Sequence, residues 1–316
     1  MKYFQQFIQT VLLLSVLVSC EHKSLCYDHD HTKTIHVNFD WKLSPNVCAK
    51  SMAVFFYRKE DGSMIKHDIP GCSGGYVRLP WGSYDVICLN SDVEGVRYKG
   101  TETFKTFEFG SRETDLLGDL GLKNIGTIPR AEHAGTEPIA RSINDIWFDA
   151  KQNFRVEYDD DSNGEIVLYP HSECCEYTIE IHNVKNLKYN TSLRGTISSL
   201  SGGIFPSSSS YSEEKVTVPF ELIGAYDGTV LKGNFLHFGC SSHKQCNHTL
   251  MVYAILSDGR QWYYQYDVSN QIHDAPDRKT VHIILDGLPL PKPIVNGGGF
   301  KPEVDGWIEI NEDIKM

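Results

Sequence analysis

The chain has 316 residues, with 30 basic and 41 acidic side chains and a formal net charge of −11 at neutral pH. An acidic chain without a basic run lacks the electrostatic footprint of a nucleic-acid-binding protein, and this excludes nucleic acid as a partner. The length is too great for one ordinary hydrophobic core and predicts two domains.

The N-terminus has the order of an export signal. Lys2 precedes the apolar run Val11–Val18, and Leu17-Val18-Ser19-Cys20 follows the pattern of a bacterial lipobox. The apolar run is too short to span a bilayer. We therefore expect residues 1–19 to be a cleaved lipoprotein signal peptide. We expect Cys20 to carry diacylglycerol and an amide-linked acyl chain such as palmitate, which would hold the protein at a membrane.

Residues 20–31 are polar and predict a lipidated tether, and from residue 32 onward short alternating segments predict strand after strand. This pattern weakens around residues 118–136, where Gly, Pro and charged residues gather, and it resumes near Phe154. Many short strands in two blocks are typical of all-β proteins with two tandem β-sandwich domains. The predicted organisation is an N-terminal sandwich at 32–127, a linker at 128–144 and a C-terminal sandwich at 145–316.

The clearest predicted unit is a hairpin, in which Asp258-Gly259 joins the β-rich runs Thr249–Leu256 and Gln261–Val268. The returning strand carries a group of aromatic rings, of which Trp262, Tyr264 and Tyr266 are candidate contacts for a protein partner or a glycan. The alternative is that the inward rings belong to the core and the outward rings form cross-strand pairs, which is the commoner arrangement in antiparallel sheets.

Eight cysteines follow Cys20, and Cys240 and Cys246 are close enough in sequence to form a disulfide that closes a loop. The segment Cys240–His248 also contains thiol and imidazole groups that suit zinc. All of them fall within one short segment, however, and their spacing misses the usual pattern of structural zinc sites. The acidic segments Asp28–His31 and Asp159–Glu165 are typical of a solvated tether and a hairpin turn. We therefore expect no metal site.

No catalytic motif is present: the sequence lacks a nucleophile elbow, a zinc-protease helix motif and a phosphate-binding glycine loop. We expect no catalytic residues, no enzymatic activity and no cofactor other than the covalent lipid on Cys20.

Several segments along the chain carry a family resemblance: Cys20–Cys26, Val37–Trp41, Val86–Asn90, Leu193–Ser198 with Ser201–Gly203, Asp286–Pro291, and Gly297–Trp307. They resemble the fimbrillin-like surface lipoproteins of Bacteroidales, an uncharacterised family related to fimbrial anchor and minor-subunit lipoproteins. The resemblance implies two transthyretin-like β-sandwiches, a lipid anchor in the outer membrane and association with surface fimbriae. Some relatives polymerise by adding a β-strand of one subunit to the next.

The final segment, Val304–Met316, has Ile308 and Ile310 alternating among acidic residues and is a candidate donor strand for another subunit. The alternative is that it closes its own sheet, since native sheets usually pair their own edges. We expect a fimbrial anchor, accessory subunit or adhesin-like component at the cell surface, which would contact fimbrial subunits or other surface proteins. The alternative function is a carbohydrate-binding surface lipoprotein of a nutrient-uptake system.

Overall fold

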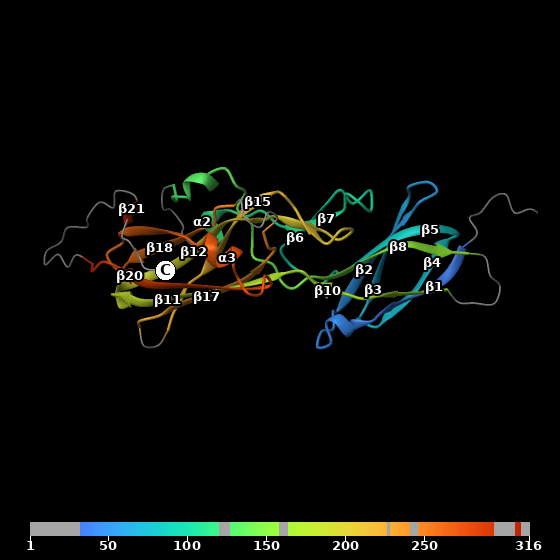
Figure 1. The fold of residues 1–316 in the computed structure, drawn as a ribbon, viewed down its shortest axis with the longest axis horizontal. Helices are drawn as coiled ribbons and strands as arrows, with labels where there is room; N and C mark the ends of the chain where they lie inside the picture. Colours follow the sequence, from blue (N-terminus) through green and yellow to red (C-terminus); the bar gives the residue numbers. More distant parts are fainter. Residues whose placement is uncertain are drawn as a thin grey trace, which may run out of the picture. The chain divides into compact units, whose positions relative to one another are not determined.

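The computed structural model describes residues 32–119, 127–157, 164–225, 228–240, 246–293 and 307–310. The predicted signal peptide, Cys20 and the tether therefore lie outside the described residues. The all-β prediction is confirmed, because strands make up most of the described chain and assemble into packed sheets (Figure 1). Within the described part of the chain, no helix combines the length and apolar character needed to cross a membrane.

The first sandwich consists of two sheets that enclose one apolar core. Its core side chains alternate along the strands, as in Ile35, Val37 and Phe39 of β1, because successive side chains of a strand point to opposite faces. The smaller sheet has the order β4-β1-β9 and the larger sheet β10-β8-β5-β2-β3. The strands are β1 (Thr32–Phe39), β2 (Ser51–Arg58), β3 (Met64–Pro70), β4 (Gly74–Pro80), β5 (Gly82–Asn90), β8 (Trp147–Val156), β9 (Gly164–Leu168) and β10 (His171–Ser172).

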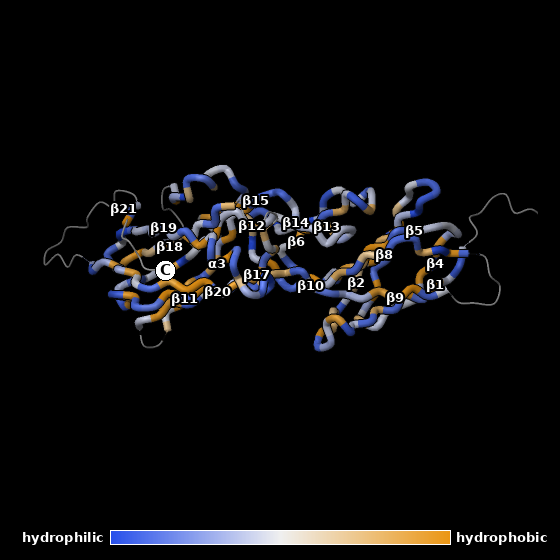
Figure 2. Tube along the Cα trace, in the orientation of Figure 1, coloured by the Kyte–Doolittle hydropathy of each residue, from blue (hydrophilic) through white to orange (hydrophobic). Residues whose placement is uncertain are grey.

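The second sandwich has sheets of order β16-β17-β11-β20 and β15-β12-β18-β19-β21, which enclose the largest core cluster. Apolar residues are visible along β11 and β20 (Figure 2), and alternate residues of these strands, such as Ile179 and Ile283, belong to this core. The strands are β11 (Cys175–Lys185), β12 (Asn190–Ser201), β15 (Lys215–Glu221), β16 (Ile223–Gly224), β17 (Leu231–His237), β18 (Thr249–Leu256), β19 (Gln261–Asp267), β20 (Thr280–Pro289) and β21 (Trp307–Ile310).

Short helices lie between the strands of both halves. They are the 3-10 helices η1 (Trp41–Leu43), η2 (Glu132–Ala134) and η3 (Leu187–Tyr189) and the α-helices α2 (Leu116–Asp119) and α3 (Ser269–His273). Leu116 and Ala134 pack with Met251 and Tyr253 on the outer face of β18, where they form a separate small apolar cluster. Strand β18 is therefore covered on both faces, since its alternate residues Leu250, Val252 and Ala254 belong to the main core.

A fifth sheet joins strands from both halves of the chain in the order β14-β13-β7-β6. Its strands are β6 (Val96–Lys99), β7 (Glu108–Ser111), β13 (Gly203–Phe205) and β14 (Ser210–Tyr211). Phe109 of β7 pairs with Ile204 of β13, and its ring lies 5.1 Å from that of Phe148 and 6.0 Å from that of Phe238. These rings belong to a third core cluster, which also buries the second face of β2 and β5.

The strand pairing differs from the expected division at 128–144. Strand β8 pairs with β5, β10 pairs with β8, and β9 pairs in parallel with β1, so these three strands complete the sheets of the first sandwich. The strands of the second sandwich begin at Cys175. The sequence pattern had indicated where these strands lie, but pairing between distant strands determines which sheet each one joins.

A disulfide joins Cys48 and Cys72, which are 24 residues apart. This bridge connects the segment before β2 with the segment before β4, and Trp41 Nε1 donates a hydrogen bond of 2.6 Å to the Cys72 carbonyl beside it. Sequence alone does not identify this pair, because eight cysteines allow many connectivities.

The packing of Phe109 in the third core cluster predicts how much its loss would destabilise the fold. Replacing Phe109 with Ala should lower the free energy of unfolding by about 3–5 kcal/mol, because it leaves a cavity among Phe148 and Phe238. Urea denaturation of the full chain measures this loss. The control Ile223→Ala, at a side chain that is 65% exposed, should change stability by less than about 0.5 kcal/mol. Equal effects of the two substitutions would contradict the packing described here.

Candidate functional site

The three aromatic rings proposed as surface contacts face inward. Tyr264 is 1% exposed and Tyr266 is 7% exposed, and Trp262 is half-buried against the same core. The Tyr264 hydroxyl donates a hydrogen bond of 3.0 Å to the carbonyl of Pro289. The prediction of a partner or glycan contact at these residues is wrong, because residues two apart share one face of a strand and here that face is the inner one.

The C-terminal strand β21 lies at the edge of a sheet of the second sandwich. It pairs in parallel with β19, with Trp307 opposite Gln261 and Ile310 opposite Tyr264. Its other edge has no neighbouring strand among the described residues. Ile308 is 40% exposed, whereas Ile310 packs against the core. A four-residue parallel pairing is a small hydrogen-bonded contact, so side chains must contribute to holding β21 in place.

Glu309 makes the main polar contacts that hold β21. The Tyr263 hydroxyl and the Gln265 amide each donate a hydrogen bond of 2.9 Å to one of its carboxylate oxygens. Burial raises the pKa of Tyr263, and the hydrogen bond to Glu309 and its negative charge raise it further. The phenol therefore stays protonated and continues to donate at neutral pH. Trp307 adds an edge-to-face ring contact with Tyr253 at a centroid distance of 5.4 Å.

A groove of about 950 Å³ lies where the loops around Glu94 and Arg141 meet strands β11, β15, β16 and β17. Its lining is mixed: Arg141, Glu180 and Lys232 contribute charged groups, and Ile223 contributes an exposed apolar side chain. Lys232 donates a hydrogen bond of 2.7 Å to Glu180 across two adjacent strands. Sequence reasoning missed this groove, because its walls come from segments that carry no common local pattern.

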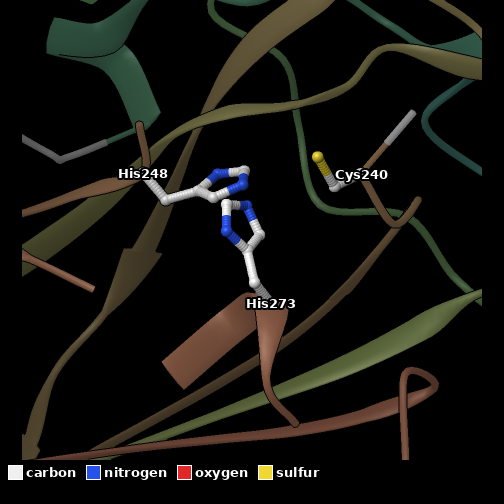
Figure 3. Close-up of side chains that lie close together, drawn as sticks. All are labelled: Cys240, His248 and His273. Carbon is white, nitrogen blue, oxygen red and sulfur yellow. The ribbon is translucent and has the colours of Figure 1, made fainter. Parts of the chain in front are cut away.

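Cys240 and Cys246 are both buried, and residues 241–245 between them lie outside the described residues. A disulfide between them stays a prediction. The structure places the thiol of Cys240 beside the imidazoles of His248 and His273, with the potential ligand atoms of all three within 4.8 Å of one another (Figure 3). His273 was not singled out from the sequence, because it lies 25 or more positions from the other two.

The contacts of Glu309 predict how firmly β21 is held. Replacing Glu309 with Ala removes two hydrogen bonds, worth about 1–2 kcal/mol in total, so the β19 amides that pair with β21 should exchange about 5- to 30-fold faster. Hydrogen-exchange mass spectrometry measures this effect. In the control Glu221→Ala, which removes a carboxylate from β15 at the opposite edge of the same sheet, exchange in β19 should not change. Unchanged protection in both variants would show that Glu309 does not hold the strand.

Comparisons with known proteins agree with this architecture. A Bacteroides ovatus protein with the provisional name fimbrium anchoring subunit Fim4B is 24% identical over 120 residues, which are 38% of this chain and 35% of that protein. The chain thus matches only about a third of that relative's length.

Two solved structures share the fold. One is a provisionally named adhesin from Bacteroides ovatus, with a TM-score of 0.64 and 18% identity over 88% of this chain and 99% of that one. The other is the fimbrial anchor protein Mfa2 from Porphyromonas gingivalis, with a TM-score of 0.50 and 12% identity over 81% of this chain and 91% of that one. The predicted relationship to fimbrial anchor and minor-subunit proteins is confirmed. A family model described as a domain of unknown function, DUF5119, matches residues 19–221, more than half of the chain, and the chain therefore belongs to this family.

Proposed function

We propose that this chain is a lipid-anchored surface protein of the outer membrane, which acts as a fimbrial anchor, accessory subunit or adhesin-like component. Its role is mechanical and not enzymatic. The lipid on Cys20 anchors the N-terminus in the membrane, and residues 21–31 form a tether between the lipid and the folded domains. The sandwiches present a sheet edge and loops to fimbrial subunits or other surface proteins. The observation that carries the proposal is an edge strand, β21, held by four residue pairs at the margin of a large sheet.

The edge at β19 gives this role a physical mechanism. If β21 leaves, the backbone groups of Gln261–Tyr264 lose their partner strand and can accept a strand from another subunit. A displaced β21 can equally be added to a sheet of the partner, where Ile308 and Ile310 would enter pockets two residues apart. Similarity to a fimbrium anchoring subunit and to the fold of Mfa2 supports the same conclusion.

The alternative function is carbohydrate binding in nutrient uptake, and the groove beside β17 is the observation that favours it. Arg141, Asn234 and Glu221 offer donors and acceptors of the kind that recognise sugar hydroxyls. A solved structure with the same fold, from Bacteroides thetaiotaomicron, is named for polysaccharide binding (TM-score 0.50, 9% identity). The aromatic rings first considered for this role lie in the core or pack against it, so the groove takes their place as the candidate site.

Lipid anchoring is tested at Cys20. In cells fed a radiolabelled or alkyne-tagged palmitate, the wild-type chain should incorporate the label and fractionate with the outer membrane. Cys20→Ala should lose both properties, because a protein without the acyl chains has no lipid anchor. The matched control Cys26→Ala removes a neighbouring thiol and should keep the label. Retention of the label by Cys20→Ala would refute lipidation at this position.

The partner is tested by chemical crosslinking in intact cells, followed by capture of the chain and identification of what it carries. Wild type should capture fimbrial subunits. Deletion of residues 304–316 should abolish this capture where β21 is the strand donated to the partner, and should increase it where the uncovered β19 edge accepts a strand from the partner. A gentler variant, Ile308→Asp, should reduce capture about tenfold, because it puts a charge on the strand proposed to meet the partner. The matched control Ile284→Asp changes an isoleucine of similar exposure on β20, 46% against 40%, and should leave capture intact.

Two outcomes would contradict the fimbrial role. One is capture of fimbrial subunits to the same extent by all four proteins, which would refute strand-mediated contact at β21. The other is capture of outer-membrane transporters or glycan that is indifferent to every C-terminal change. In that case glycan-array binding that is lost in Arg141→Ala would establish the carbohydrate-binding alternative.

A further inference from the structure

A cluster of potential metal ligands lies in the second sandwich and shares no residue with β21 or with the lining of the groove. Cys240 follows β17, His248 precedes β18, and His273 ends α3. Figure 3 shows the two imidazole rings pointing toward each other with the Cys240 thiol beside them. The ring centroids of His248 and His273 are 5.0 Å apart at an interplanar angle of 73°.

His248 presents a free lone pair to this cluster. Its side chain is fully buried, and its Nδ1 lies 3.0 Å from the backbone carbonyl of Ser198. Because a carbonyl oxygen only accepts, Nδ1 carries the proton and donates it, and in the neutral imidazole this leaves Nε2 unprotonated. Nε2 is buried and has no hydrogen-bond partner. An imidazole that donates Nδ1–H to a backbone carbonyl while Nε2 stays available has the usual arrangement of a metal-binding histidine.

The backbone around Ser198 is shaped to make this contact. The pairing of β12 with β15 shifts register between Ile197 and Leu200, and Ser199 has a φ of 63°, so the strand bulges here. The Glu137 carboxylate accepts hydrogen bonds from the Ser199 amide at 2.9 Å and its hydroxyl at 2.7 Å, which stabilises the bulge. Bulges turn groups out of the regular ladder, and here the bulge directs the Ser198 carbonyl to His248.

The second imidazole is held in place by its helix. Ile272 of α3 is buried in the main core, and the Gln271 side chain exchanges two hydrogen bonds, of 3.1 and 2.7 Å, with the backbone of Ile284. The His248 amide donates a hydrogen bond of 2.8 Å to the hydroxyl of Ser269, the first residue of α3. The helix and the His248 backbone are therefore tied together. Nε2 of His273 is also buried without a hydrogen-bond partner.

We propose that Cys240, His248 and His273 form a binding site for a divalent cation of the zinc class. Two neutral imidazole nitrogens and one thiolate are typical zinc ligands, and a fourth position remains for water or another donor. Ligand atoms around tetrahedral zinc lie about 3.3–3.8 Å apart, so a cluster already within 4.8 Å needs to contract by about 1 Å. The metal would also give partners to two buried nitrogens that otherwise have none.

The predicted disulfide between Cys240 and Cys246 competes with this site, because a thiol in a disulfide cannot bind the metal as thiolate. Within the segment Cys240–His248 alone, the ligand spacing does not fit a structural zinc site. The fold supplies a ligand from α3, so the ligands no longer come from one short loop. A Cys240–Cys246 disulfide and metal binding by the Cys240 thiolate exclude each other, and an experiment can separate them.

The test is a titration of the full chain, purified without reductant, with Zn²⁺ alone. We expect one ion to bind per chain and the midpoint of thermal unfolding to rise with Zn²⁺ concentration. His273→Gln should weaken binding by more than about tenfold, since even loss of a group that only supports a ligand typically costs about 10- to 100-fold. The matched control His282→Gln alters an exposed histidine of β20 and should bind as wild type does.

A spectroscopic readout identifies the thiolate. Co²⁺ bound at the site should give a thiolate-to-cobalt charge-transfer band in the near ultraviolet, and Cys240→Ser should abolish that band. Circular dichroism establishes that each variant is folded before it is titrated. Three results would overturn the proposal: no Zn²⁺ binding by wild type, equal binding by wild type and His273→Gln, or a Cys240–Cys246 disulfide in peptide maps of the unreduced protein.

Discussion

The structure depends on a sheet that is buried on both faces. In β2, Met52, Val54 and Phe56 pack into the core of the first sandwich, while the alternate residues Phe55 and Tyr57 pack into the third cluster. Strand β5 divides its side chains in the same way. Because successive residues of a strand point to opposite faces, one run of apolar residues supplies two cores at once. Such strands cannot be exposed on either side, and the rest of the chain must cover them.

The covering segments come from both halves of the chain. Phe109 of β7 and Ile204 of β13 pair in a small sheet whose apolar side chains close the third cluster. Arg97 and Lys99 bind the Glu214 carboxylate at 2.6 and 2.8 Å beside that sheet. The two sandwiches are thus connected by burial and by backbone pairing, and not by a simple linker.

Three features of the second sandwich and its surroundings are candidates for a function. They are the sheet edge at β21, the groove beside β17 and the ligand cluster of Cys240, His248 and His273. The sheet of order β15-β12-β18-β19-β21 has a large core on one face and a small cluster on the other, and the short strand β21 forms one of its two edges. A sheet with a short edge strand suits a protein that binds other proteins by β-strand addition, through main-chain hydrogen bonds. The bulge at Ser198 and Ser199 occurs in that same sheet, where it orients His248.

Local patterns were sufficient for the parts of the prediction that depend on neighbouring residues. The Asp258-Gly259 hairpin and the alternating strands both follow from spacing within a few positions, and the all-β class follows from them. The lipobox before Cys20 is also a local pattern, and it stays a prediction. Only the tertiary structure decided which face of β19 is the inner one, because either face of an alternating strand can be buried until its partners are known. The same holds for β9, which pairs with β1 from 129 positions away, and for His273, which reaches Cys240 only through the packing of α3. Contacts between distant segments depend on how entire faces of strands and helices pack together. A short stretch of sequence contains no information about the partner face.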